Sequence, residues 1–223
     1  MILKNRRFKR RQPKRDARVF IIFCEGRKRE PQYFAYFNEI DSRIRFEIIP
    51  PQEGRDESPT GLYQNAAKML LTTPENPNPE YPINEQDEVW FVIDTDAWGE
   101  KITTLRNECA THSNWQIAQS NPCFEVWLYY HFRSDFPEFE GVEISKKWKS
   151  YLNDDVQKGG FKSQKHPILI QTAIENAKVN YIEKDNFLEI GTTQVFQLAE
   201  RFYPYIKDDI EAELAKFTSK NSE

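Results

Sequence analysis

The sequence is poor in the residues that build disulfide frameworks and zinc sites. Its three cysteines, Cys24, Cys109 and Cys123, are odd in number, lie far apart and include no CxxC pair. Its three histidines are equally scattered. A disulfide scaffold needs paired cysteines, and a zinc or non-haem iron site needs clustered nitrogen or sulfur ligands. The composition argues against both classes, so we expect oxygen ligands for any metal that this chain holds.

Long apolar runs are also missing. No run approaches the roughly 18 to 20 residues that a membrane helix needs, and no apolar segment of the signal-peptide kind follows the basic N-terminus. The composition, 39% hydrophobic and 30% charged, is that of a folded protein rather than a disordered one. We therefore expect a soluble, cytoplasmic, globular protein.

Charge is distributed unevenly along the chain. Positions 1–18 hold nine Lys or Arg and one acid, a net charge of +8, which leaves −12 on the remainder (22 basic and 34 acidic residues) and −4 in total. A basic arm on an acidic body is typical of a chain that contacts phosphate backbones locally. A disordered solubilising tail is the alternative interpretation.

Beyond the arm, apolar strands alternate with amphipathic helices. Short apolar runs bounded by turn residues predict buried strands, and apolar residues three or four apart predict helices. The predicted strands are 19–24, 46–49, 89–94 and 115–120, and the predicted helices between them are 31–41, 58–71 and 99–111. This alternation favours a mostly parallel sheet flanked by helices on both faces.

The second half of the chain, from about position 121, has the pattern of a helical region. The helices predicted there are 122–132, 143–154, 167–184 and 192–217. The sequence thus predicts an α/β fold with a helical C-terminal extension. We divide it into a basic arm (1–17), an α/β domain (18–135) and a helical C-terminal region packed on that domain (136–223).

Acidic residues follow three of the predicted strands. In VWFVIDTDAWGE (89–100), Asp94 and Asp96 end a run of five apolar residues, and in an extended chain they point to the same side. Glu25 follows the first strand, and Glu125 lies just beyond the fourth. Parallel sheets bind ligands at the carboxyl ends of their strands, and carboxylates aimed together repel unless a cation or a proton lies between them. A site for a hard divalent cation is therefore predicted at this edge.

Each of these acids also has a purely structural interpretation. A DxD can cap a helix or a turn, the Glu25 segment can be a solvated turn, and Glu125 can stabilise a helix N-terminus. In CEGRKRE (24–30), the cations that follow Glu25 are available to phosphate, while Glu30 can pair with one of them. The loop KGGFKSQKHP (158–167) offers Lys162 and Lys165 to a phosphate, or is simply a flexible loop.

The ordered set CEGRKREPQYF, FVIDTD and SNPCFEVWLYYHF resembles the RloB family, bacterial proteins with a Toprim-like domain encoded near restriction and anti-phage genes. The resemblance covers about residues 17–200. It implies a Toprim fold, in which a glutamate after the first strand and a DxD after the third bind magnesium for phosphodiester chemistry. Glu25, Asp94 and Asp96 match those positions. Lys162 or Lys165 loosely matches the catalytic lysine of some Toprim nucleases.

The resemblance also implies a partner, since related Toprim effectors work beside an ABC-type or AAA-type ATPase and some cut tRNA or DNA. We therefore expect a Mg²⁺-dependent endonuclease, with Mn²⁺ as the alternative ion, that acts on RNA such as tRNA, or on DNA, in anti-phage defence. Asp94 and Asp96 would hold the metal, Glu25 would be a ligand or general base, and Glu125 a second-site ligand. Restraint would come from the ATPase, from assembly into a homo-oligomer or from a phage trigger.

Three other functions stay open at this point. A small-molecule phosphohydrolase would act on free mononucleotides without cutting nucleic acid. A noncatalytic regulatory or sensor subunit of an ATPase would still support defence after Asp94→Ala. A protein that only binds nucleic acid would do so unchanged in a chelator.

Overall fold

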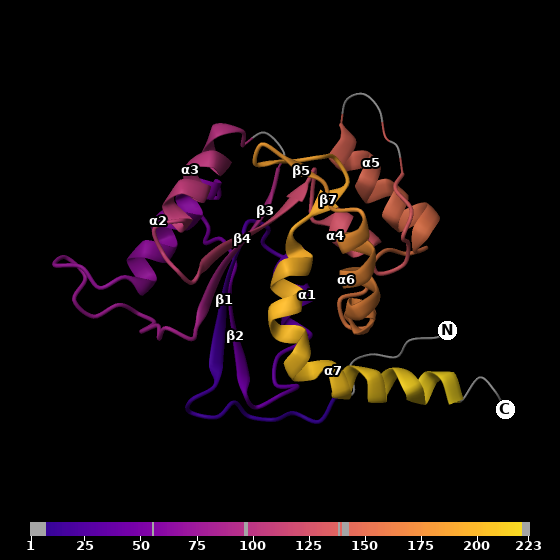
Figure 1. Ribbon diagram of the computed structural model, residues 1–223, viewed down its shortest axis with the longest axis horizontal. Coiled ribbons are helices and arrows are strands. Elements are labelled where there is room, and N and C mark those ends of the chain that lie inside the picture. The colour runs from indigo at the N-terminus through magenta and orange to yellow at the C-terminus, as the bar shows by residue number, and fades with distance from the viewer. Residues whose placement is uncertain (1–7, 55, 96–97, 138, 140–142, 220–223) are drawn as a thin grey trace.

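A computed structural model describes residues 8–54, 56–95, 98–137, 139 and 143–219 of the chain. Its centre is a five-stranded sheet in the order β2-β1-β3-β4-β7 (Figure 1). The strands β2, β1, β3 and β4 are parallel, and β7 pairs antiparallel with β4. The predicted α/β class, with a mostly parallel sheet, is confirmed. The strand bounds are Arg18–Cys24 (β1), Ile44–Ile49 (β2), Glu88–Asp94 (β3), Trp115–Asn121 (β4) and Thr192–Thr193 (β7).

The central strands are buried on both faces because their side chains alternate between two apolar cores. Along β1, Phe20 and Ile22 belong to one core, and Ile21 and Phe23 belong to the other. Strand β3 divides in the same way. A strand that is covered on both sides has no room for polar positions, which is why its sequence is continuously apolar.

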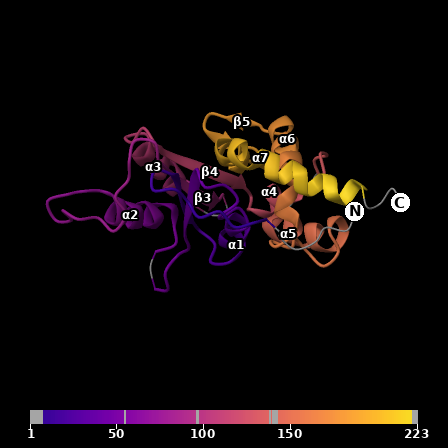
Figure 2. The ribbon, with the colours of Figure 1, turned by 90° about the horizontal axis from the view of Figure 1, so that it is seen from below.

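Helices cover both faces of the sheet, as Figures 1 and 2 show. The smaller core packs under α2 (Pro59–Leu70) and α3 (Glu100–Cys109). Helix α2 begins where the hydroxyl of Ser58 accepts a hydrogen bond from the backbone N–H of Gly61, with Pro59 in the first turn.

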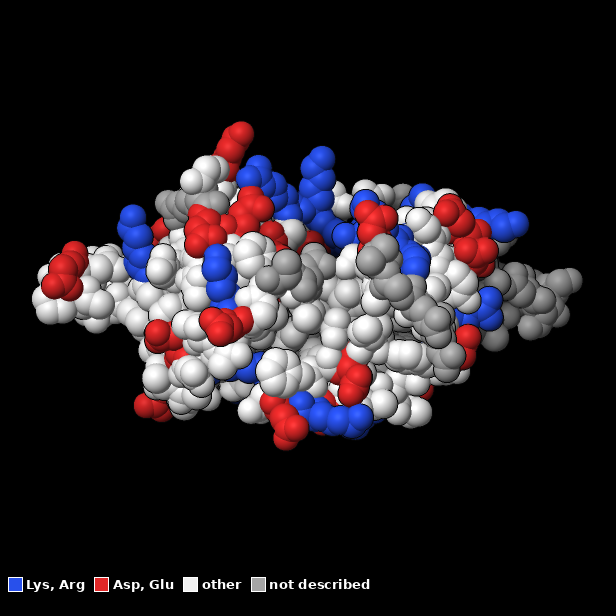
Figure 3. All heavy atoms as spheres, turned by 90° about the horizontal axis from the view of Figure 1, so that it is seen from above, with Lys and Arg blue, Asp and Glu red and all other residues white. Residues whose placement is uncertain are grey.

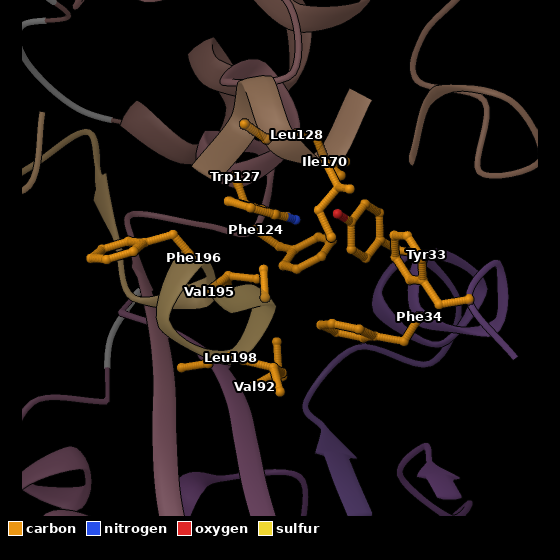
Figure 4. Packing of buried hydrophobic residues seen from close by; sticks show 14 of the residues in the cluster. Tyr33, Phe34, Val92, Phe124, Trp127, Leu128, Ile170, Val195, Phe196 and Leu198 are labelled. Atoms are coloured by element: carbon orange, nitrogen blue, oxygen red, sulfur yellow. The ribbon is translucent and has the colours of Figure 1, made fainter. Parts of the chain in front are cut away.

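The opposite face carries the larger core, which draws its side chains from several helices. Figure 4 shows aromatic and aliphatic side chains of α1 (Arg29–Ala35), α4 (Glu125–Tyr129) and α7 (Val195–Ser219) pointing into one cluster. Phe124, Trp127, Leu128 and His131 are all buried there, as their helical spacing predicts. This aromatic packing fixes the start of α4 against α1.

The described residues of the C-terminal region 136–223 share this core and also complete the sheet. The predicted helix 167–184 ends early, because the chain leaves the helix at Val179 and forms an antiparallel hairpin. The last helix begins at Val195 and not at Thr192. Thr192 and Thr193, which we predicted to be helical, pair with the end of β4. The remaining elements are α5 (Ile144–Tyr151), the π-helix η1 (Leu152–Val156), the 3₁₀-helix η2 (His166–Leu169), α6 (Ile170–Val179), β5 (Glu183–Lys184) and β6 (Phe187–Leu188).

Helix α7 bends partway along its length, which Figure 1 shows clearly. Pro204 lies inside the helix, where its ring removes a backbone hydrogen bond and favours a kink. Within the described residues, no helix combines the length and the apolar character that crossing a membrane requires.

The described part of the basic arm, residues 8–17, lies along the protein body. The ring of Phe8 packs edge-on against Tyr36, with 5.8 Å between ring centroids. The guanidinium of Arg11 forms an ion pair with Asp209 of α7 at 2.7 Å, and the Arg11 backbone N–H donates to the carbonyl of Glu39. These contacts hold the arm in place past the end of α1. Residues 1–7 lie outside the described residues.

Candidate functional site

The carboxyl ends of β1 and β3 bring the first two predicted site residues together. The strands pair in parallel with Cys24 opposite Val92, and the N–H of Glu25 continues the ladder by donating to the Val92 carbonyl at 3.0 Å. Asp94 is the last residue of β3. Because β2 and β3 flank β1 on opposite sides, this is the point where the strand order reverses, which is where open α/β sheets bind ligands.

Hydrogen bonds from Asp94 and Trp98 hold the carboxylate of Glu25. One oxygen accepts the backbone N–H of Asp94 at 2.9 Å, and the other accepts the indole N–H of Trp98 at 2.7 Å. Bonds from two directions fix the carboxylate plane across the gap between the strands. Trp98 is a residue that the sequence did not single out, because an indole donor in a loop has no recognisable pattern.

The chain after Asp94 is tied back to β4 through Thr95. The Thr95 N–H and hydroxyl both donate to the carbonyl of Ser120, and the side-chain amide of Gln119 donates to the Thr95 hydroxyl at 2.8 Å. Asp96, the second acid of the DTD motif, lies outside the described residues. Its predicted place beside Asp94 stays a prediction.

Glu30 is the main addition that the structure makes to the predicted site. It lies in the first turn of α1 with 6% of its surface exposed, and its Oε2 has no hydrogen-bond partner among the described residues. Burial raises the pKa of the Glu30 carboxyl, and the nearby charge of Glu125 raises it further, while Lys149 and Arg29 oppose the shift. The sequence suggested only that Glu30 pairs with a neighbouring cation, because the motif does not reveal that its side chain turns inward.

The glycine of the CEG motif makes this position of Glu30 feasible. A Cβ at Gly26 would stand 2.1 Å from Glu30 Oε2, closer than any real contact. The absence of a side chain at Gly26 therefore lets the carboxylate fold back over the end of β1. This is a steric requirement, distinct from the turn geometry for which glycine is usually chosen.

Glu125 reaches the same place from the start of α4. It is 7% exposed. Burial raises the pKa of the neighbouring Cys123 thiol, and the charges of Glu125 and Asp94 raise it further. Cys123 therefore stays a protonated thiol. The predicted second-site acid thus lies beside Asp94 and Glu30. No spacing in the sequence could establish this, because 94 residues separate Glu30 from Glu125 along the chain.

The acidic side chains line a cavity of about 360 Å³ at this edge of the sheet. Cations stand around it, and Figure 3, viewed from above, shows Lys and Arg side chains lying among acidic ones on this face. The guanidinium of Arg27 pairs with Glu57, while Lys149 of α5 comes from a part of the chain that the sequence did not connect with the site. The cavity is lined by Glu25, Gly26, Arg27, Lys28, Arg29, Glu30, Glu57, Asp94, Trp98, Glu125 and Lys149.

Lys162 and Lys165, the two predicted catalytic lysines, line a neighbouring cavity instead. That cavity, of about 580 Å³, lies along α1 and is also lined by Arg29, Gln32 and Tyr36. Arg29 lines both cavities, and its guanidinium donates to the carbonyl of Phe161 at 3.2 Å. The structure thus places the two lysines next to the acidic cavity but not among the residues that line it.

The donor set of the acidic cavity fits a hard divalent cation. Carboxylate oxygens are the ligands that Mg²⁺ prefers, and the partnerless Oε2 of Glu30 is a buried acceptor of the kind that a cation satisfies. Among the described residues, which exclude Asp96, no three Asp, Glu, His or Cys side chains already stand in a metal-ligand arrangement. The carboxylates present are suited to the ion, and their oxygens would have to converge on it.

Fold and site together define an α/β protein with an acidic cavity at the switch point of a parallel sheet, bordered by cations. The model of the RloB-like protein family matches residues 20–202, so the chain belongs to that family. No curated protein and no solved structure matches the chain. The predicted family is confirmed.

Proposed function

We propose that this chain is a Toprim-type, divalent-metal-dependent endonuclease, the effector of a bacterial anti-phage defence system that an ATPase partner controls. Its substrate would be RNA, tRNA included, or DNA. The observation that carries the proposal is the buried Glu30 carboxylate, which lines one cavity with Glu25, Asp94 and Glu125. Its Oε2 has no hydrogen-bond partner in the part of the chain that the structure describes.

A buried, unpartnered carboxylate beside other carboxylates lowers the stability of the folded protein. A buried polar atom without a hydrogen bond costs about 1 to 3 kcal/mol, and neighbouring carboxylates add repulsion. A group that weakens the fold in this way is expected where ligand binding or catalysis requires it. A divalent cation would offset both the desolvation and the repulsion.

Glu30, Asp94 and Glu125 are the described residues that would hold Mg²⁺ or Mn²⁺, with Asp96 as the further ligand that the sequence predicts. When bound, the ion neutralises charge that develops on the phosphodiester and makes water a stronger nucleophile at neutral pH. Hydrogen bonds from the Asp94 N–H and the Trp98 indole orient Glu25. In this proposal Glu25 would accept a proton from the attacking water or complete the ligand set.

The cations at the rim have a separate role in this proposal. Lys28 and Lys149 line the acidic cavity, where their charges would attract the phosphate and favour its approach to otherwise repulsive carboxylates. Burial raises the pKa of the Glu30 carboxyl, and the positive charge of Lys149 opposes that rise, which is consistent with a position near the carboxylate. It is therefore the described lysine best placed to stabilise negative charge on the substrate.

The test is cleavage of total tRNA and of plasmid DNA by the wild type, Asp94→Ala and a control, Glu57→Gln, in Mg²⁺ and in EDTA. Each protein is assayed alone and together with any ATPase that is encoded beside its gene. Products that depend on Mg²⁺, persist in the control and vanish in Asp94→Ala would support the proposal and identify the substrate. Full defence by Asp94→Ala in cells, with no products under any condition, would refute it in favour of a regulatory subunit.

A further inference from the structure

The cavity that contains Lys162 and Lys165 has the features of a preformed anion site. Among its described lining residues are the cations Arg29, Lys162 and Lys165, and none is an acid. The Lys165 ammonium makes no hydrogen bond or ion pair with any described residue. The site is therefore cationic without internal neutralisation, unlike the acidic cavity beside it.

The loop that presents these lysines is held by the core beneath it. Phe161 is 3% exposed and packs against Tyr33, His131 and His166. The backbone N–H of Lys162 donates to Nδ1 of His166 at 2.9 Å. Because the buried Phe161 fixes the loop, Lys162 and Lys165 already line the cavity. Binding of a ligand there therefore loses little additional conformational entropy of the loop.

The two cavities and the basic arm follow one another along α1. Arg29, at the start of the helix, lines both cavities, and Tyr36, just after its end, lines the lysine cavity and contacts Phe8 of the basic arm. Seven residues of helix span about 10 Å, comparable to roughly three nucleotides at the 3.4 Å axial spacing of one DNA strand. The acidic cavity, the lysine cavity and the arm therefore follow one another over a few nucleotides.

We propose that the lysine cavity binds the phosphate backbone of the same nucleic-acid strand that is cut in the acidic cavity, a few nucleotides from the scissile phosphate. The inference rests on the proposed nuclease function. Lys162 and Lys165 are then positioning residues, not catalytic ones, which revises the role that we predicted for them. The strand runs from the acidic cavity past Arg29 and the two lysines towards Phe8.

The test is binding of a fluorescein-labelled 12-nucleotide single-stranded RNA, measured by anisotropy in EDTA so that cleavage does not interfere. For single strands, each phosphate contact contributes about 0.7 to the slope of log K against log salt. Lys165→Gln should lower that slope by about 0.7. If wild type and variant converge near 1 M salt, this weakens binding roughly eightfold at 50 mM and threefold at 200 mM.

Lys68→Gln is the matched control, because Lys68 is an exposed lysine on α2, across the sheet from α1. It should leave both affinity and slope unchanged. An unchanged slope in both Lys162→Gln and Lys165→Gln would overturn the proposal, as would an equal loss in Lys68→Gln.

A kinetic readout separates positioning from catalysis. Where cleavage is measurable, Lys165→Gln should raise KM severalfold and leave kcat at saturating substrate within about twofold, as loss of uniform binding predicts. A fall in kcat with unchanged binding would contradict the positioning role. The anisotropy result needs no cleavage, so failure of the nuclease proposal and failure of this binding site are distinguishable.

Discussion

Replacing Glu30 by glutamine should remove function while keeping or increasing stability. Glutamine has nearly the shape of glutamate but no charge, so Glu30→Gln relieves both the burial of a carboxylate and its repulsion by Glu125. An unpartnered buried polar group costs about 1 to 3 kcal/mol. Because the amide keeps part of that cost, we expect the free energy of unfolding at pH 7 to rise by about 1 kcal/mol.

For a chain of this size, 1 kcal/mol corresponds to a rise in Tm of about 2 to 4 °C. The measurement is urea and thermal unfolding without divalent ions, followed by the cleavage assay in Mg²⁺. Glu57→Gln is the control, because Glu57 lines the same cavity but forms an ion pair with Arg27. Both side chains are largely open to solvent, with 38% of Glu57 and 50% of Arg27 accessible. Because an exposed ion pair contributes little to stability, the free energy of unfolding should not rise in Glu57→Gln.

A loss of more than 1 kcal/mol in Glu30→Gln would refute this reasoning, because it would mean that the carboxylate stabilises the fold. Full Mg²⁺-dependent cleavage by the variant would refute it from the other side. If Glu30 is kept for function and not for stability, Glu30→Gln must both gain stability and lose activity.

Three further predictions follow from the same contacts. Gly26→Ala should displace the Glu30 carboxylate, a flexible group, and so reduce cleavage at least tenfold with little change in urea unfolding; wild-type activity would contradict the steric argument. Trp98→Phe removes a hydrogen bond to Glu25 and should weaken Mn²⁺ binding about 10- to 100-fold in a calorimetric titration, whereas an unchanged affinity would exclude Glu25 from the metal site. Burial lowers the pKa of His131 to about 3, so below pH 6.5 protons favour the unfolded chain, and stability should fall by about 2 kcal/mol from pH 7 to pH 5 in urea titrations; equal losses in His131→Gln would assign the effect elsewhere.

The fold was largely predictable because its strands are buried on both faces. Continuous apolar runs such as VFIIFC and VWFVI leave no choice of exposed side, so their positions and the α/β class follow from the pattern. The short strand at Thr192 and Thr193 was not predictable. Two residues have no period, and they pair because the end of β4 lies beside them, where the hydroxyls of Ser120 and Thr193 are 2.8 Å apart.

The acids that end neighbouring strands were the predictable part of the candidate site. Glu25 and Asp94 lie together because parallel strands end at one edge, a rule that needs only the order of elements. Glu30 and Lys149 required the structure. Whether an acid in a helical first turn faces inward depends on Gly26 and on the packing of α1, and the approach of α5 is a long-range contact that no local pattern encodes.

Binding of Mn²⁺ to the purified chain, followed by electron paramagnetic resonance, tests the central claim most directly, because it needs neither the substrate nor the ATPase. We predict saturable binding to the wild type and to Glu57→Gln, with affinity reduced at least tenfold in Glu30→Gln and in Asp94→Ala. Binding of equal strength in all four proteins would show that the ion lies elsewhere, and would contradict the assignment of this acidic cavity as the metal site.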